Sequence, residues 1–508
     1  MRVSIVDIFN DIVEKKYSDV AVEHNEESIR YGELRKKAYS VANCLIQETN
    51  VSINNIIAVF LPNEINVIVS DIGILYSGNA FMNLDIKTPT ERIQNILEII
   101  KPKVVITNSK YLKIFENMDI AVIDIEAISV NDKDDIITTK REILIDTDPM
   151  CIINTSGSTG TPKGVVLNHR SFWDFMNWAG ETFSFDGSEV IGSLSPVVFD
   201  IFVFELCMLM IKGSKIVLLD SSKAIFPASL LNELNNKEVN FIFWVPSIMV
   251  NIANLDLIRR IPLPKLKLVW FAGEVFPTKQ FLYWYDNIPN AQFVNLYGPI
   301  EITLDCTYHV IEERPKEDTP LPIGKACRNS DILILNENDE ICGFNEEGEL
   351  CVRGTSLAMG YYNNPEKTLN AFVQNPLNNS YPELIYRTGD IVNKDENDII
   401  HFKGRRDTLI KHMGYRIELG EIEHMVVNEF KIVNYCCALY DYQNKKIVLY
   451  YENENEITPQ EFRKKLSTIF PNYMLPNSFY RMDLLPRNTN GKIDRLKLKN
   501  LLYGENAK

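Results

Sequence analysis

Residues 150–164 read MCIINTSGSTGTPKG. The first part of this stretch, MCIINT, is an apolar run of the length and composition typical of a buried strand. A loop of hydroxyl residues and glycines that contains Lys163 follows at once. Hydroxyl donors, free backbone N–H groups and a lysine can together surround phosphate oxygens. The stretch therefore predicts a strand that ends in a phosphate-binding loop.

This loop differs from the two common nucleotide-binding motifs. A Gly-x4-Gly-Lys-Ser/Thr loop needs a glycine where Pro162 stands and a hydroxyl residue where Gly164 stands. The dinucleotide pattern Gly-x-Gly-x-x-Gly is absent as well. A flexible Ser/Gly turn is the structural alternative, but the strand before the loop and the lysine within it favour phosphate binding.

Outward from this loop, strand-like and helix-like patterns alternate in two successive runs. The first covers about residues 56–220, with strands expected at 56–60, 101–107, 150–155 and 215–220 and helices at 64–78 and 90–101. The second has strands expected at 239–247, 266–273 and 291–298. Such alternation is typical of parallel sheets covered by helices on both faces. We therefore predict an α/β protein with two parallel, doubly wound βα subdomains.

The pattern changes after about residue 320. Short strands and turns at 331–336, 348–354 and 398–404 predict a β-barrel-like subdomain, and residues 431–470 predict a small α+β unit. We expect an N-terminal domain at 1–404 and a mobile C-terminal domain at 405–508.

Composition and charge exclude several classes of protein. The chain has 508 residues, 45% of them hydrophobic and 24% charged, which is ordinary globular usage. Its formal charge of -15 argues against nucleic acid or an anionic membrane as the main partner. Residues 405–508 are the exception, with 17 Lys and Arg against 13 Asp and Glu. Residues 1–404 therefore carry a formal charge of -19.

Cysteines, histidines and the first residues point to a cytoplasmic protein without a zinc site. The nine cysteines form no Cys-x-x-Cys pair and are expected to be reduced. The six histidines have no metal-ligand spacing. Asp7 interrupts the N-terminus before a signal-like apolar segment can form, and no membrane insertion is expected.

Further motifs follow the loop in a fixed order. They are NLYGPIE at 295–301, GELCVRG at 348–354, YRTGD at 386–390, GRRD at 404–407 and NGKIDR at 490–495. In this order they resemble the acyl-adenylate-forming (AMP-binding) enzymes. Within that superfamily the chain looks like the amino-acid adenylation domains of non-ribosomal peptide synthetases and the D-alanine:carrier-protein ligases, and the resemblance runs from about Tyr31 to Arg495.

The resemblance implies a reaction and a set of residues. A substrate carboxylate attacks the α-phosphate of ATP, pyrophosphate leaves, and an acyl-AMP forms. Catalytic roles fall to Lys492 at the carboxylate and α-phosphate, Glu301 as the Mg²⁺ ligand, and Asp407 as the hinge. The implied ATP-binding residues are Thr155, Ser156, Gly157, Ser158, Thr159, Gly160, Lys163, Gly273, Glu274, Asn295, Tyr297, Gly298, Asp390, Arg405 and Lys492. One position departs from the family: Ile300 stands where a hydroxyl residue is usual, so that contact is lost or supplied by a neighbour such as Thr303.

The resemblance also implies an amino-acid substrate. Asp200 falls where amino-acid-activating relatives pair an aspartate with the substrate ammonium, although an aspartate that caps a helix is the structural alternative. The other implied pocket residues are Phe199, Ile201, Phe204, Trp244, Trp270, Ala272, Leu296, Leu304 and Asp305. Large aromatic side chains favour a small substrate, and the set looks most like serine-selective pockets, with alanine or glycine as alternatives.

Only 13 residues follow Arg495, without a Gly-Gly-x-Ser site for phosphopantetheine. The expected product acceptor is therefore the phosphopantetheine thiol of a separate acyl or peptidyl carrier protein. In the family, the C-terminal domain rotates about the residue matching Asp407, withdraws the lysine and presents the loop near Gly414 to the thiol. An acyl- or aryl-CoA ligase on the same scaffold, and a nucleotide-binding protein with impaired catalysis, are the alternative hypotheses.

Overall fold

The structure is a computed structural model of the whole chain. It describes residues 5–47, 49–50, 52–155, 162–220, 226–406, 408–487 and 493–503. The chain divides into two compact units. Unit 1 comprises Met1–Ile86, Ile100–Ile153 and Gly164–Gly404, and unit 2 comprises Lys87–Ile99, Asn154–Lys163 and Arg405–Lys508.

The predicted strand MCIINT is confirmed as part of β7 (Pro149–Thr155), in a seven-stranded sheet. The order of this sheet is β18 (Gly360–Tyr361), β8 (Lys163–Asn168), β7, β4 (Ala80–Asn83), β3 (Ile56–Val59), β5 (Val104–Thr107) and β6 (Ala121–Asp124). Strands β3 to β6 pair in parallel, as does β4 with β7. The helices of this part of the chain are α1 (Ile5–Lys16), α2 (Tyr31–Gln47), α3 (Ile65–Tyr76), α4 (Thr90–Ile100) and α5 (Asp135–Ile143).

A nine-stranded sheet forms the second layer of strands. Its order is β15 (Lys325–Ala326), β14 (Thr307–Val310), β13 (Gln292–Tyr297), β12 (Leu268–Phe271), β11 (Phe241–Trp244), β9 (Val190–Ser193), β10 (Lys215–Leu218), β1 (Val20–His24) and β2 (Glu27–Arg30). The strand expected at 215–220 is confirmed, but it lies here rather than beside β7. It pairs in parallel with β9 and β1. Periodicity identifies a strand but not its partner, because partners can lie far apart in the sequence.

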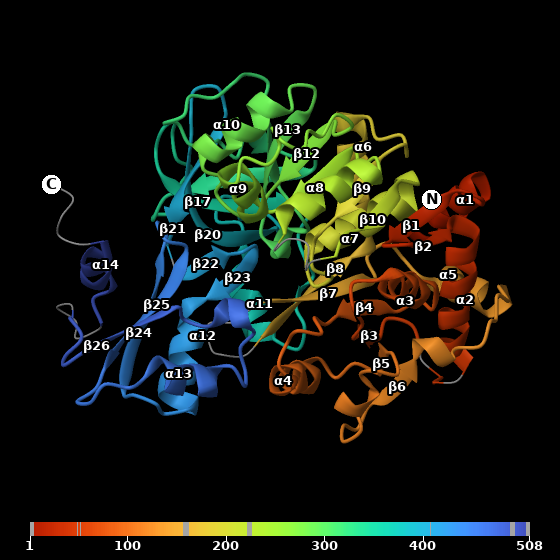
Figure 1. Cartoon of the computed structure of the whole chain (residues 1–508), viewed down its shortest axis with the longest axis horizontal. Helices are drawn as coiled ribbons and strands as arrows, with labels where there is room; N and C mark the ends of the chain where they lie inside the picture. The colour runs from red at the N-terminus through yellow and green to blue at the C-terminus, as the bar shows by residue number, and fades with distance from the viewer. Residues whose placement is uncertain are drawn as a thin grey trace. The chain divides into compact units, whose positions relative to one another are not determined.

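The two faces of the nine-stranded sheet are covered by different helices (Figure 1). Helices α6 (His169–Phe183) and α7 (Asp200–Cys207) pack on the larger core, which we call the front core. Helices α8 (Pro227–Asn236), α9 (Pro246–Asn254) and α10 (Thr278–Asn287) pack on a second core, the back core. Side chains alternate along each strand, so neighbouring residues of β11 enter different cores.

The strand-rich part expected after residue 320 is a five-stranded antiparallel sheet. Strands β16 (Ser330–Leu335), β17 (Gly348–Gly354), β20 (Leu384–Lys394) and β19 (Phe372–Gln374) are neighbours in this order, and β21 (Ile400–Arg405) pairs with β20. Helix α11 (Pro365–Ala371) precedes β19. At the end of unit 1, Gly404 has φ +151°, a backbone conformation that favours glycine.

The C-terminal part of unit 2 contains a three-stranded sheet with a core on each face. Strand β25 (Lys446–Glu452) lies between β24 (Tyr435–Asp441) and β26 (Ser478–Met482). Helices α12 (Leu419–His424) and α13 (Pro459–Leu466) contribute to the larger core, and α14 (Arg495–Tyr503) to a smaller one. The hairpin of β22 (Leu409–His412) and β23 (Tyr415–Glu418) precedes α12.

All nine cysteines are free and buried. Within the described ranges, the structure contains no helix that is both long and apolar enough to cross a membrane.

Candidate adenylation site

The predicted phosphate loop lies between β7 and β8. Thr155 ends β7 with 6% of its surface exposed, and its Oγ1 atom has no hydrogen-bond partner among the described residues. Lys163 begins β8 and is half-buried. Ser156, Gly157, Ser158, Thr159 and Gly160 lie outside the described residues. A buried hydroxyl without a partner is unusual in proteins and is consistent with a ligand oxygen as its partner.

Glu301 is the carboxylate that the sequence predicts as the metal ligand. It lies in the short 3₁₀ helix Ile300–Ile302 directly after β13 and is completely buried. The Tyr361 hydroxyl, from β18, donates a hydrogen bond of 2.8 Å to its Oε1 atom. The Ala358 N–H donates to the Glu301 carbonyl oxygen at 2.9 Å. Both the side chain and the backbone of Glu301 are therefore held in place by the segment 358–361.

The backbone after Glu301 adopts a costly conformation. Thr303 and Leu304 have φ of +54° and +67°, a region that β-branched and bulky residues rarely occupy. A Cβ on Gly298 would lie 2.2 Å from the Leu304 carbonyl oxygen, so only glycine permits this approach. The Thr303 side chain is completely buried, and its Oγ1 atom has no described partner. Such strain is concentrated at functional sites, where the surrounding structure enforces it.

Asp390 and Tyr297 form the part of the site assigned to the ribose and adenine. The Tyr297 hydroxyl donates a hydrogen bond to Asp390 Oδ2, and both residues are buried. Burial, and next the Asp390 charge, raise the pKa of Tyr297 well above its usual value, so the phenol stays protonated and remains a donor. The Asp390 N–H in turn donates to the Thr388 hydroxyl at 3.0 Å. This network fixes the orientation of the carboxylate.

The other implied adenosine residues lie at the ends of β12 and β13. Asn295 is buried on β13 and donates to the Pro322 carbonyl oxygen at 2.7 Å. Gly273 follows β12 with φ +90°, and a Cβ there would contact only Val245. Glu274 accepts a hydrogen bond of 2.9 Å from the Ser247 N–H. Arg405 is half-buried at the end of β21, whereas Lys492 and Asp407 lie outside the described residues.

The implied amino-acid pocket begins at the N-terminus of α7. Asp200 is the first residue of this helix and is half-buried, and its Oδ1 atom accepts a 2.9 Å hydrogen bond from the Ile201 N–H. Phe199 precedes the helix and makes no side-chain cap. The helix N-terminus stabilises the negative charge of Asp200. The remaining pocket residues found in the front core are Ile201, Phe204, Trp270, Ala272, Leu296 and Leu304, and Asp305 is buried next to Leu304.

Aromatic rings fill the front core beside this helix. The rings of Phe204 and Trp270 stack with centroids 5.2 Å apart. Phe243 meets each of them edge to face at 5.5 Å. The indole N–H of Trp270 is buried and has no described hydrogen-bond partner. The three rings therefore pack against one another within the front core.

The assignment of Trp244 to the pocket is not supported by its position. Its ring lies in the back core, and its indole N–H donates to the Gly192 carbonyl oxygen at 2.8 Å. Phe243, one residue earlier on β11, lies in the front core instead. The reason is the alternation of a strand, in which adjacent side chains point to opposite faces of the sheet.

One buried acid on α7 was not predicted. Glu205 has no exposed surface and accepts a hydrogen bond from the Ser193 hydroxyl of β9. Burial raises its pKa to about 8, so it is mostly protonated at neutral pH. Phe243 and Tyr361 were not predicted either. Phe243 pairs with Trp270 on the neighbouring strand, and paired residues point to the same face of a sheet, so the alternation of side chains could have identified it. No local feature of the sequence links Tyr361 to Glu301.

Glu301 offers carboxylate oxygens, a ligand type that Mg²⁺ accepts. Within the described ranges, no cluster of three or more His, Cys, Asp or Glu side chains could hold a metal ion. The buried Glu301 would hold Mg²⁺ if ATP phosphates and water supplied most of the oxygen ligands.

Comparisons with known proteins identify the family. The model of the AMP-binding enzyme family matches residues 9–362, well over half of the chain. The chain belongs to the AMP-binding enzyme family. Zwittermicin A synthase ZmaJ from Bacillus cereus is 29% identical over 97% of this chain and 94% of its own length. Tyrocidine synthase 1 from Brevibacillus parabrevis is 29% identical over 97% of this chain, which spans only 45% of that protein.

Solved structures of the family have the same fold. The adenylation domain AlmE of Vibrio cholerae, solved with glycyl-adenosine-5'-phosphate, superposes with a TM-score of 0.85 at 20% identity, over 99% of this chain and 98% of that one. The o-succinylbenzoate CoA synthetase MenE of Bacillus subtilis gives a TM-score of 0.85 at 19% identity, over 97% and 98%. The protein is an ATP-dependent, adenylate-forming ligase of the type found in non-ribosomal peptide synthetases, and the family uses Mg²⁺.

Proposed function

We propose that this ligase activates a small amino acid and transfers it to a separate carrier protein. A carboxylate oxygen of the amino acid attacks the α-phosphorus of ATP, and the bond to the β-phosphate breaks, which releases pyrophosphate. The phosphopantetheine thiol of the carrier then attacks the carbonyl carbon of the aminoacyl-AMP. AMP leaves, and a thioester forms.

The observation that carries the proposal is the position of Asp200. Its carboxylate lies at the start of α7, next to apolar residues of the front core, and is half-buried. A carboxylate in such surroundings gains most from a cation, and the ammonium group of an amino acid supplies one. A simple carboxylic acid has no such group.

The size and polarity of the pocket support a small amino acid. Phe204, Phe243 and Trp270 restrict its volume, and the buried Asp305 can accept a hydrogen bond from a substrate hydroxyl. We therefore place serine first, with alanine and glycine as alternatives. AlmE, which shares the fold, was solved with a glycyl adenylate.

ATP binds through groups that the chain already orients. Asp390, held by the Tyr297 hydroxyl, accepts the ribose hydroxyls, while Asn295 and Gly273 lie at the adenine edge. The buried hydroxyls of Thr155 and Thr303 donate to phosphate oxygens, and Thr303 replaces the donor that Ile300 cannot provide. Glu301 holds Mg²⁺, which neutralises phosphate charge when bound.

Two residues of the C-terminal domain are proposed to separate the two half-reactions. Lys492 stabilises the charge that develops between the carboxylate and the α-phosphate. Rotation about Asp407, which adjoins the boundary at Gly404, then removes this lysine and admits the thiol. An Asp407→Pro variant is therefore expected to retain pyrophosphate exchange and lose carrier loading, and equal loss of both would refute the hinge.

The decisive experiment is ATP–pyrophosphate exchange over all amino acids. We expect exchange with serine, alanine or glycine, and about 100-fold loss in Asp200→Ala, because the substrate ammonium would lose the carboxylate that pairs with it. Asp135→Ala, at an exposed position of α5, is the matched control. Exchange only with large aromatic amino acids would refute the small pocket.

The second candidate function is an acyl- or aryl-CoA ligase, which the fold shared with MenE favours. It is supported if Asp200→Ala leaves activity unchanged and simple carboxylic acids are the better substrates with coenzyme A. ATP binding without exchange for any acid would instead indicate a protein with impaired catalysis.

A further inference from the structure

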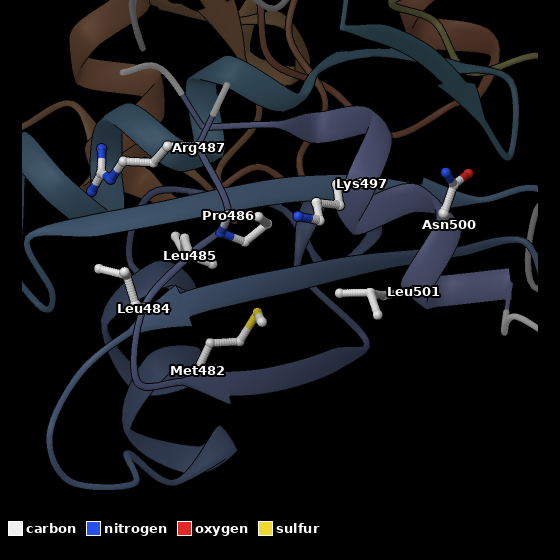
Figure 2. Close-up of a pocket in the computed structure, with 8 residues that line it drawn as sticks. All are labelled: Met482, Leu484, Leu485, Pro486, Arg487, Lys497, Asn500 and Leu501. Carbon is white, nitrogen blue, oxygen red and sulfur yellow. The ribbon is translucent and has the colours of Figure 1, made fainter. Parts of the chain in front are cut away.

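A groove of about 540 Å³ lies on the C-terminal part of unit 2 (Figure 2). It runs between the end of β26, the loop that follows, and α14. Its lining residues are Met482, Leu484, Leu485, Pro486, Arg487, Lys497, Asn500 and Leu501. Met482 and Leu501 point toward one another across it (Figure 2).

The apolar side chains of this groove are unusually exposed. Leu484 and Leu501 have 66% and 51% of their surface exposed, and Leu496, on the same helix, has 69%. These are the only leucines in the described part of unit 2 with more than half of their surface exposed. Leu485 forms the floor, is completely buried, and belongs to the small core beneath α14. Exposed apolar residues that gather around a concavity indicate a binding surface.

The charged residues described in the groove are both basic. Arg487 and Lys497 line it, and none of the other described lining residues is acidic. The Arg487 guanidinium lies 4.4 Å from the ring centroid of Tyr435 and 3.5 Å from Glu452, so it is held at the rim. Lys497 lies one helical turn before Leu501 on the same face of α14. A partner must therefore present apolar side chains flanked by carboxylates.

We propose that this groove docks an acidic amphipathic helix of a separate protein. A concave groove of this size receives apolar side chains spaced one turn apart, while the flanking cations pair with acidic residues of the same helix. A membrane surface is less well matched, because the buried floor at Leu485 is beyond the reach of a flat layer of lipid. The docking of an acidic helix does not depend on the proposed function. Identifying its protein as the carrier protein does rest on that function.

The test uses two fluorescent peptides with the full-length protein. Both have leucines at helical spacing; one carries glutamate at the other positions, and its counterpart carries lysine there. We expect the acidic peptide to bind with an affinity that falls as salt rises, and the basic one not to bind. Leu501→Glu and Lys497→Glu should each weaken binding by about tenfold. Pyrophosphate exchange should be unchanged in both variants.

Matched controls are Leu369→Glu on α11 of unit 1 and Lys464→Glu on α13 of unit 2, both at exposed positions. Equal binding of the two peptides, or equal weakening by the controls, would overturn the proposal. So would binding to anionic vesicles that Leu501→Glu abolishes, or a dimer that Leu501→Glu dissociates in sedimentation. Failure of pyrophosphate exchange in the unchanged protein would instead refute the proposed function and leave the peptide result standing.

Discussion

Trp244 and Trp270 occupy adjacent strands of one sheet and are both fully buried, yet their surroundings differ. Trp244 lies in the back core, where its indole N–H is paired with the Gly192 carbonyl oxygen. Trp270 lies in the front core among aromatic rings, and its N–H has no described partner. The Trp244 indole N–H is thus satisfied within the protein, whereas the Trp270 indole N–H is a donor that a ligand can satisfy. We infer that the back face serves stability and the front face serves the reaction.

The largest expected effect comes from emptying the back core. Trp244→Ala should destabilise the protein by about 3–5 kcal/mol, because a large ring leaves a cavity and the Gly192 carbonyl loses its partner. Urea unfolding measures this loss. The order of preference among amino acids in pyrophosphate exchange should stay the same at a temperature where the variant is folded. A changed order of preference would show that the back face contributes to the pocket.

The next effect comes from enlarging the front core. Phe243→Ala should shift the preference toward larger amino acids, by about 10- to 200-fold in relative kcat/KM, since a change of pocket volume is worth about 1–3 kcal/mol. Pyrophosphate exchange over aliphatic and aromatic amino acids measures the shift. Ile242→Ala, at the neighbouring residue in the back core, is the matched control. If Ile242→Ala changes the preference and Phe243→Ala does not, the assignment of the two faces is wrong.

The buried acid Glu205 should make the stability of the protein depend on pH. Its pKa is raised from 4.5 to about 8, so between these values the folded protein binds more protons than the unfolded chain. Its contribution to stability is complete below about pH 4.5 and is lost as the pH rises toward 8, by at most about 1.4 kcal/mol per pH unit. Urea unfolding from pH 6 to 9 should show this decline, and Glu205→Gln should flatten it. An equal decline in the variant would assign it to another group.

The last comparison concerns the two indole N–H groups directly. Trp244→Phe removes a made hydrogen bond and should cost about 1–3 kcal/mol beyond the change in ring size, because the Gly192 oxygen is left unpaired. Trp270→Phe removes an N–H without a described partner and should lack that penalty. Urea unfolding of both variants gives the difference. Equal losses would indicate that Trp270 has an unseen hydrogen-bond partner.

Much of the fold followed from local patterns. The strand at 150–155 and those of the second run were predicted from apolar periodicity and are present. The roles expected of Glu301, Asp390 and Asp200 followed from the resemblance of short motifs to those of the family. In the structure Glu301 lies just after β13, Asp390 lies within β20, and Asp200 begins α7. The placement of β10 in the nine-stranded sheet did not follow, because strand pairing joins residues that are distant in the sequence.

The chemical groups of the site can be read from the amino-acid sequence: a hydroxyl-rich loop with a lysine, a set of ordered motifs, and an aspartate that begins an apolar helix. Their surroundings could not be read from it: Phe243 rather than Trp244 enters the front core, Tyr361 holds Glu301, and Thr303 is buried without a described partner. The physical reason is that a residue's type is local, whereas its face and its neighbours are set by strand pairing and by packing between segments far apart in the chain.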